Sequence, residues 1–180
     1  MFGLTIDPVL TNKLKPLRAL IMDVDGVLTD GRILIDNRGS ETKAFDVRDG
    51  HGLKLLQRGG LVPVLLTGRY SQIVKQRAAE LGITLVHQRS HDKLASYQLI
   101  KRQLQLADHE FAYIGDDLID IPVLKRVGFS ATVADAVAEV AEMADWQSRF
   151  PGGRGAVREL CQLILVAQGK WSALVERYYR

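Results

Sequence analysis

Short apolar runs alternate along this chain with segments in which apolar residues recur at helical spacing. The apolar runs, at 19–22, 61–66, 83–86, 111–114 and 129–133, are predicted strands. The helical spacing falls in 50–58, 70–80, 91–106, 135–143 and 155–168. Strands with continuous apolar runs are typical of parallel sheets that are covered on both faces. We therefore predict an α/β fold, a doubly wound parallel sheet whose strands are joined by right-handed crossovers.

A β-hairpin is predicted between the first two strands, over residues 31–46. Two β-rich runs, 32–36 and 41–46, flank the turn cluster NRGS. The hairpin carries many apolar residues for a two-stranded ribbon, which is marginal in water unless it packs on something. It either covers a site at the adjacent sheet edge or pairs with another subunit. No other insertion is long enough to form a cap domain.

The length of 180 residues is that of one domain, here 17–169, with an N-terminal extension at 1–16 and a tail at 170–180. The 24 basic and 21 acidic residues give a net charge of only +3, which suits a small anionic ligand and predicts no nucleic-acid partner. Cys161 is a predicted core residue. The absence of a signal peptide and of a membrane-length apolar run predicts a cytoplasmic protein with no membrane partner.

Polar side chains follow three of the predicted strands at the point where each strand ends. Asp23 and Asp25 follow the first strand, Thr67 follows the second, and Asp116 and Asp117 follow the fourth. Because parallel strands present their carboxyl ends at one edge of the sheet, we expect these side chains to converge. Magnesium is typically held by one or two carboxylates together with phosphate oxygens of a substrate. The pattern therefore predicts a Mg²⁺ and phosphate site.

The acidic residues suggest a specific phosphoryl-transfer chemistry. Asp23 is the candidate nucleophile, and Asp25 is the candidate general acid and base. Asp116 would complete the metal site, and either Asp117 or Asp120 would orient the metal ligands.

Two further residues are candidates for binding the phosphate. Thr67 offers a hydroxyl and, at a predicted helix N-terminus, a backbone N–H. Lys93, near the start of another helix, offers a compact positive charge to the phosphate and to Asp23.

The four segments DVDG at Asp23, TGR at Thr67, Lys93 and GDDLID at Gly115 together resemble the four motifs of the haloacid dehalogenase superfamily. The resemblance implies a Mg²⁺ cofactor. The implied ligands are the carboxylates of Asp23 and Asp116 and the backbone carbonyl of Asp25. It also implies that Asp23, Asp25, Thr67 and Lys93 are the catalytic residues.

One branch of that superfamily is a closer match. FDVRDGHG, LLTGR, GDDLIDIPVL and GGRGAVREL resemble segments of the 3-deoxy-D-manno-octulosonate 8-phosphate (KDO 8-phosphate) phosphatases, and the similarity runs over about 17–170. Lys54 stands where some relatives carry arginine, which puts a bidentate contact to a substrate carboxylate in doubt there. The residues implied to bind substrate are Asp25, Asp46, Val47, Arg48, Asp49, Gly50, Lys54, Arg69, Arg77 and Lys93.

The predicted function is therefore Mg²⁺-dependent hydrolysis of KDO 8-phosphate through an aspartyl phosphate, in lipopolysaccharide core biosynthesis. The alternatives are a phosphatase for another sugar acid phosphate, such as a nonulosonate 9-phosphate, and a non-catalytic scaffold of the same fold. The resemblance also implies a homotetramer with the site at a subunit boundary. The tail at 170–180 is either disordered or inserts at a neighbouring active site.

Overall fold

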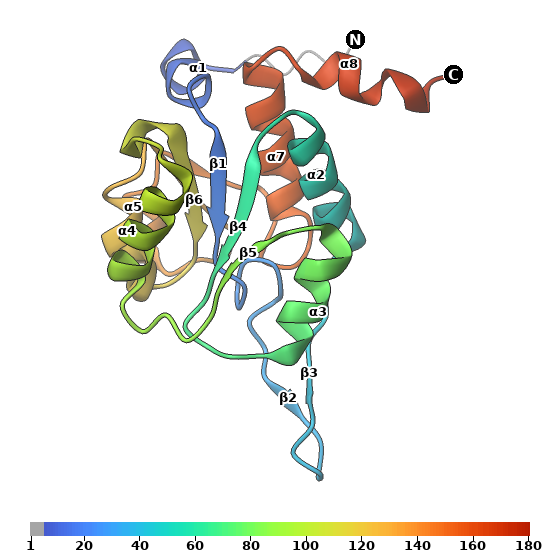
Figure 1. The fold of residues 1–180 in the computed structure, drawn as a ribbon, viewed down its shortest axis with the longest axis vertical. Coiled ribbons are helices and arrows are strands. Elements are labelled where there is room, and N and C mark those ends of the chain that lie inside the picture. The colour runs from blue at the N-terminus through green and yellow to red at the C-terminus, as the bar shows by residue number, and fades with distance from the viewer. Residues whose placement is uncertain (1–5) are drawn as a thin grey trace.

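A sheet of six parallel strands forms the centre of the structure, a computed structural model that describes residues 6–180 (Figure 1). The spatial order is β5-β4-β1-β6-β7-β8, so the chain builds outward from β1 first to one side and then to the other. This order confirms the doubly wound α/β prediction. The strands are β1 (Ala19–Met22), β4 (Val62–Leu66), β5 (Leu85–His87), β6 (Phe111–Gly115), β7 (Phe129–Thr132) and β8 (Trp146–Gln147).

Helices cover both faces of the sheet, as continuous apolar strands require. Leu20 and Met22 of β1 pack in the core beneath one helical layer, whereas Ala19 and Ile21 pack in the core beneath the other. Successive side chains of a strand point to opposite faces, so one four-residue strand contributes to both cores. The first layer holds α2 (Val47–Arg58), α3 (Gln72–Leu81) and α7 (Ala156–Ala167), and the second holds α4 (Lys93–Leu104), α5 (Ile121–Leu124) and α6 (Ala138–Ala141).

The predicted hairpin is present and extends from the carboxyl edge of the sheet away from the body of the protein (Figure 1). Its paired region is shorter than predicted, because only β2 (Leu34–Ile35) and β3 (Glu41–Thr42) are bonded to each other. Beyond Thr42 the side chain of Lys43 turns to Asp25, and the chain continues into α2. Ile33, Leu34 and Ile35 are more than half exposed, at 55%, 52% and 62%.

Helix α1 (Pro8–Leu14) and helix α8 (Trp171–Val175) lie at the opposite end of the molecule from the hairpin (Figure 1). Residues 1–5 of the expected N-terminal extension lie outside the described residues, and the rest includes helix α1 (Pro8–Leu14), which buries Leu14. The tail forms α8 (Trp171–Val175) and a 3-10 turn (Glu176–Tyr178), so the expectation of a disordered end is wrong. Trp171 and Leu174 of the tail pack against the core. The Tyr178 hydroxyl lies 3.0 Å from His51 Nε2 of α2, within hydrogen-bond distance.

The periodicity did not reveal every element. Strand β8 is two residues long at the sheet edge, too short to leave an apolar run. The helix expected over 135–143 contracts to α6, and α2 begins at Val47 because Asp46 caps it and accepts a hydrogen bond from the Arg48 N–H. Within residues 6–180, no helix combines the length and apolar character needed to cross a membrane.

Candidate active site

Asp23 lies directly beyond β1, at the bottom of a cleft of about 250 Å³. Its backbone N–H donates to Ile114 O of the neighbouring strand β6 at 3.1 Å, which continues the sheet register to this residue. One carboxylate oxygen accepts from the Val24 N–H at 2.7 Å, and the other pairs with Lys93 Nζ at 2.7 Å. Burial raises the pKa of Asp23, and Lys93 opposes that rise. The carboxylate is thus held rigidly at the sheet edge.

Lys93 is the first residue of α4, where Asp92 caps the helix. It is 3% exposed, and its ammonium also donates to Asp120 Oδ1 at 2.6 Å. Burial alone lowers the pKa of Lys93, but the charges of Asp23 and Asp120 outweigh burial and the net shift is upward. Lys93 therefore remains a cation at the base of the cleft.

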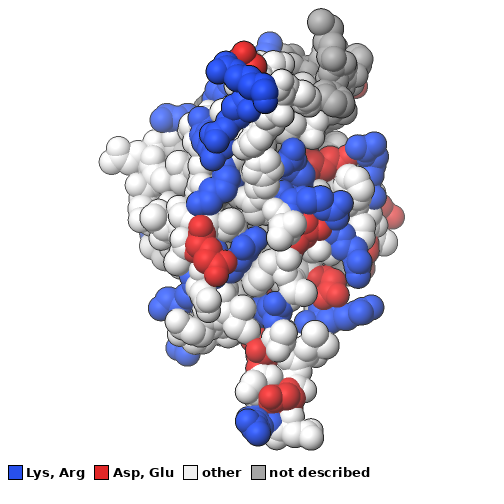
Figure 2. Space-filling view, turned by 90° about the vertical axis from the view of Figure 1, so that its right-hand side faces the viewer, with Lys and Arg blue, Asp and Glu red and all other residues white. Residues whose placement is uncertain are grey.

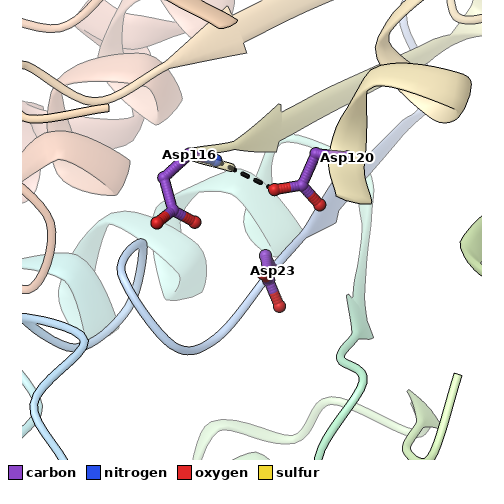
Figure 3. Close-up of side chains that lie close together, drawn as sticks. All are labelled: Asp23, Asp116 and Asp120. Carbon is purple, nitrogen blue, oxygen red and sulfur yellow. Dashed lines mark hydrogen bonds between the residues drawn. The ribbon is translucent and has the colours of Figure 1, made fainter. Parts of the chain in front are cut away.

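Of the two candidate acids, Asp117 and Asp120, it is Asp120 that organises the loop after β6. It is fully buried, and its Oδ2 accepts from the Asp116 N–H at 3.0 Å (Figure 3). The same oxygen also accepts from the Asp117 N–H at 3.2 Å. Asp117 is exposed, and its carboxylate accepts a hydrogen bond from the Leu118 N–H beside it. The tertiary structure thus selects Asp120 as the residue that fixes the loop carrying Asp116.

The carboxylates of Asp23 and Asp116, with the negative charge of Asp120 beside them, fit a divalent cation. Oxygens of the three lie within 4.8 Å of one another (Figure 3). Asp116 Oδ1 is buried and has no hydrogen-bond partner among residues 6–180. Burial, together with the charges of Asp23 and Asp120, raises the pKa of Asp116 to about 8. When all three carboxylates are ionised, Lys93 balances only one of their negative charges, so the donor set suits a hard dication such as Mg²⁺.

Gly26 allows Asp116 to approach the loop after β1. Its φ is +89°, and a Cβ at this position would lie 2.1 Å from Asp116 Oδ2. An L side chain would be strained in this conformation and would displace the carboxylate. The glycine of the DVDG segment is therefore required by contact with the neighbouring strand's acid.

Thr67 lines the cleft, but not at the start of a helix as expected. Helix α3 begins at Gln72, and the Thr67 N–H donates to His87 O at 2.9 Å instead of facing the cleft. The prediction of a free backbone N–H at Thr67 is wrong, because β4 continues its pairing with β5 to this residue. The hydroxyl remains as the group that Thr67 offers to a phosphate.

Three charged side chains, those of Lys43, Glu41 and Arg69, lie around Asp25 at the base of the hairpin. Lys43, whose side chain is 2% exposed, pairs with Asp25, and Arg69 Nη2 donates to Glu41 Oε1 at 2.8 Å. Arg69 Nε also lies 3.8 Å from Asp25 Oδ2. Sequence analysis did not single out Glu41 and Lys43; their i, i+2 spacing on a strand was the available signal.

Most of the residues that the resemblance assigns to substrate lie outside the cleft that contains Asp23. They lie mainly on α2 and α3, whose face carries basic side chains interspersed with acidic ones (Figure 2). Arg48 and Asp46 line a separate depression of about 330 Å³. Arg77 lies over the Phe45 ring at 5.8 Å and contacts Gly50.

Three other residues that the resemblance assigns to substrate binding, Val47, Lys54 and Asp49, also lie on α2. Val47 is 78% exposed, and Lys54 lies against Gly82 at the end of α3. Asp49 is 1% exposed and accepts hydrogen bonds from the N–H groups of Gly155 at 3.2 Å and Arg158 at 2.7 Å. Within one chain Asp49 therefore anchors the start of α7.

Comparison with known proteins agrees with the geometry. Residues 84–158 match the haloacid dehalogenase-like hydrolase family model. The chain is 47% identical over 158 residues to the 3-deoxy-D-manno-octulosonate 8-phosphate phosphatase of Escherichia coli K12, which covers 88% of this chain and 84% of the relative.

Solved structures superpose over most of the chain. The Yersinia pestis 3-deoxy-D-manno-octulosonate 8-phosphate phosphatase has a TM-score of 0.91 at 44% identity and covers 93% of this chain and 90% of its own. The Moraxella catarrhalis enzyme of that name, in complex with magnesium, phosphate and KDO, has a TM-score of 0.92 at 39% identity over 94% and 98% of the two chains. This chain therefore belongs to the 3-deoxy-D-manno-octulosonate 8-phosphate phosphatase family of haloacid dehalogenase-like hydrolases.

Proposed function

We propose that this chain is a Mg²⁺-dependent phosphatase that hydrolyses KDO 8-phosphate to KDO and inorganic phosphate. The observation that carries the proposal is the cleft in which Asp23, Lys93 and Asp116 meet at the carboxyl edge of the sheet. A relative that covers nearly the whole chain was solved with magnesium, phosphate and KDO together. The donor set in this cleft suits the first two of those ligands.

In the proposed reaction an Asp23 carboxylate oxygen attacks phosphorus, and the bond between phosphorus and the sugar oxygen breaks. Asp25 donates a proton to the departing oxygen, and it then takes a proton from the water that hydrolyses the aspartyl phosphate. The Thr67 hydroxyl would donate a hydrogen bond to a phosphoryl oxygen, and the charge of the Lys93 ammonium would stabilise the phosphoryl group electrostatically. Bound Mg²⁺, held by Asp23, Asp116 and the Asp25 backbone carbonyl, would supply electrostatic stabilisation of the charge on the phosphoryl group.

Phosphate release tests the proposal directly. KDO 8-phosphate is compared with a panel of sugar phosphates that includes a nonulosonate 9-phosphate, with Mg²⁺ and with chelator. Asp23→Asn removes the nucleophile, and Asp108→Asn is the control, since Asp108 lies before β6 at the opposite end of the sheet. We expect the wild type to prefer KDO 8-phosphate. Phosphate release should be lost when chelator replaces Mg²⁺ and in Asp23→Asn, but it should be retained in Asp108→Asn. Equal activity on all the sugar phosphates would refute the proposal that KDO 8-phosphate is the substrate. No phosphate release from any sugar phosphate would favour the alternative of a non-catalytic scaffold.

We further propose a homotetramer in which the residues of α2 and α3 reach a neighbour's cleft. Two features support this: the exposed apolar hairpin, and the separation of Arg48 and Arg77 from Asp23 within one chain. If the site is shared, mixing inactive Asp23→Asn subunits with inactive Arg77→Ala subunits restores activity, because some clefts then receive both intact halves. Failure to restore activity in verified mixed oligomers would contradict a shared site.

The place of the reaction in the cell follows from the proposed substrate. KDO released in the cytoplasm would supply lipopolysaccharide core synthesis. Accumulation of KDO 8-phosphate in the soluble fraction of cells that lack this chain would support that role, and an unchanged level would contradict it.

A further inference from the structure

Tyr113 is a buried phenol directly beneath the cleft, and the reaction described above does not use it. It lies on β6, is fully buried, and faces the core that β6 shares with α4 and α5. The rest of that core is apolar except for a second tyrosine, Tyr97, and the network of Lys93 and Asp120 beside it. A hydroxyl at this position is therefore unlike its surroundings and calls for a partner.

The Tyr113 hydroxyl has two partners, and both belong to the network that holds Asp23. It donates to Asp120 Oδ1, the oxygen that also accepts from Lys93 Nζ at 2.6 Å. Lys93 Nζ itself lies 3.4 Å from the phenol oxygen. Burial and the charge of Asp120 raise the pKa of Tyr113 well above its usual value, so the phenol keeps the proton that it donates.

This arrangement engages the three N–H donors of the Lys93 ammonium with Asp23, Asp120 and Tyr113. An ammonium group on a flexible stem has no fixed direction of its own, so its position depends on its acceptors. The hydroxyl also occupies a lone pair of Asp120 Oδ1. Without that bond, Oδ1 would be free to draw Lys93 away from Asp23. Asp120 Oδ2 remains fixed by the N–H groups of the next loop.

We propose that Tyr113 is a positioning residue: its hydroxyl fixes Asp120 Oδ1 and thereby holds the Lys93 ammonium against Asp23 and the transferred phosphoryl group. The inference rests on the proposed phosphatase function. The Tyr113 hydroxyl bonds Asp120 Oδ1, the oxygen that contacts Lys93, whereas Asp120 Oδ2 holds the loop of Asp116. The proposal therefore connects the hydroxyl with Lys93 and the phosphate, not with Asp116 and the metal. Removing the hydroxyl should slow phosphoryl transfer without weakening either substrate or Mg²⁺ binding.

The chain contains a matched control for a purely structural role. Tyr97, also fully buried, donates to Asp108 Oδ1 at 2.6 Å, and Lys101 Nζ donates to the same oxygen at 2.7 Å. This second set of tyrosine, aspartate and lysine lies toward the opposite end of α4, away from the cleft. Tyr97→Phe and Tyr113→Phe each delete one hydroxyl bonded to an aspartate that also binds a lysine. Only Tyr113→Phe touches the network of Asp23.

The experiment measures kcat, KM, the Mg²⁺ concentration for half-maximal rate and the thermal midpoint of wild type and both variants. The substrates are KDO 8-phosphate and p-nitrophenyl phosphate. We expect Tyr113→Phe to lower kcat about tenfold, the size of one hydrogen bond to a charged group, with KM and the Mg²⁺ midpoint within about twofold of wild type. Tyr97→Phe should lower the thermal midpoint about as much as Tyr113→Phe does, but it should leave kcat within about twofold of wild type.

Several outcomes would overturn the inference. These are an unchanged kcat for Tyr113→Phe, an equal fall in kcat for Tyr97→Phe, or a Mg²⁺ midpoint that rises in step with the loss of kcat. An unfolded Tyr113→Phe protein would also overturn it, because the hydroxyl would then serve the fold itself. Wild-type turnover of p-nitrophenyl phosphate without turnover of KDO 8-phosphate would refute the proposed substrate while leaving the Tyr113 comparison valid. No turnover of either substrate by wild type would overturn both proposals.

Discussion

Replacing Lys93 by methionine removes the ammonium that bonds both Asp23 and Asp120. The side chains of the three residues are 1%, 6% and 0% exposed, so water cannot take over the role of the lysine. Methionine fills a similar volume, so the change removes a charge without opening a large cavity. The variant therefore isolates the electrostatic contribution of Lys93 to the fold.

The expected loss is large because the partners remain buried. Breaking a buried ion pair by removing one partner lowers the free energy of unfolding by about 3–5 kcal/mol. Lys101→Met is the matched comparison on the same helix, since Lys101 pairs with Asp108 at 2.7 Å but is 31% exposed. An exposed pair contributes about 0.2–1 kcal/mol. The two variants should therefore differ by several kcal/mol in the same assay.

The assay is urea denaturation of wild type and both variants, first with chelator and then with millimolar magnesium. Without the lysine, the carboxylates of Asp23, Asp116 and Asp120 have no compensating charge, so a bound dication should stabilise Lys93→Met more than wild type. The stability gap should therefore narrow when magnesium replaces chelator. Phosphate release by Lys93→Met should fall by about 100-fold or more. Equal destabilisation by the two variants, or a gap that does not respond to magnesium, would refute the reasoning.

Three further predictions test other parts of the site. Burial raises the pKa of Asp49 from 3.8 to about 6, so the folded state binds this proton more tightly than the unfolded chain and stability is lost as the pH rises through that interval. In urea denaturation, the stability of Asp49→Asn relative to wild type should rise by about 2–3 kcal/mol between about pH 4 and about pH 7; a pH-independent difference would exclude a raised pKa for Asp49 in the folded state. Gly26→Ala should reduce phosphate release by about tenfold or more, because its Cβ would displace Asp116, whereas Gly39→Ala, at φ +79° with no atom within 4 Å, should retain activity; equal activities would contradict the steric argument. Leu34→Glu on the exposed hairpin should dissociate the proposed tetramer, measured by light scattering, and an unchanged mass would place the interface elsewhere.

Apolar runs and their polar endings predicted much of the fold and of the cleft. The runs that became β1, β4 and β6 are continuous, and each ends in a polar turn, so a parallel sheet places Asp23, Thr67 and Asp116 at one edge. This inference needs only the direction of the strands, which the alternation with helices supplies. It succeeded because burial and strand direction are recorded locally in the sequence.

Contacts between elements could not be read in the same way. The pattern left Asp117 and Asp120 as equal candidates, and burial of Asp120 against Lys93, 27 residues earlier, decided between them. Thr67 lost its expected free N–H because β4 pairs with β5 up to that residue.

The sequence by itself determined the class of fold, the edge that bears the chemistry and the residue types gathered there. Only the tertiary structure showed that Asp49 holds the start of α7 and that Tyr113 supports Asp120 from below. The physical reason is that periodicity reports whether a side chain is buried, whereas its hydrogen-bond partner depends on which distant element packs against it.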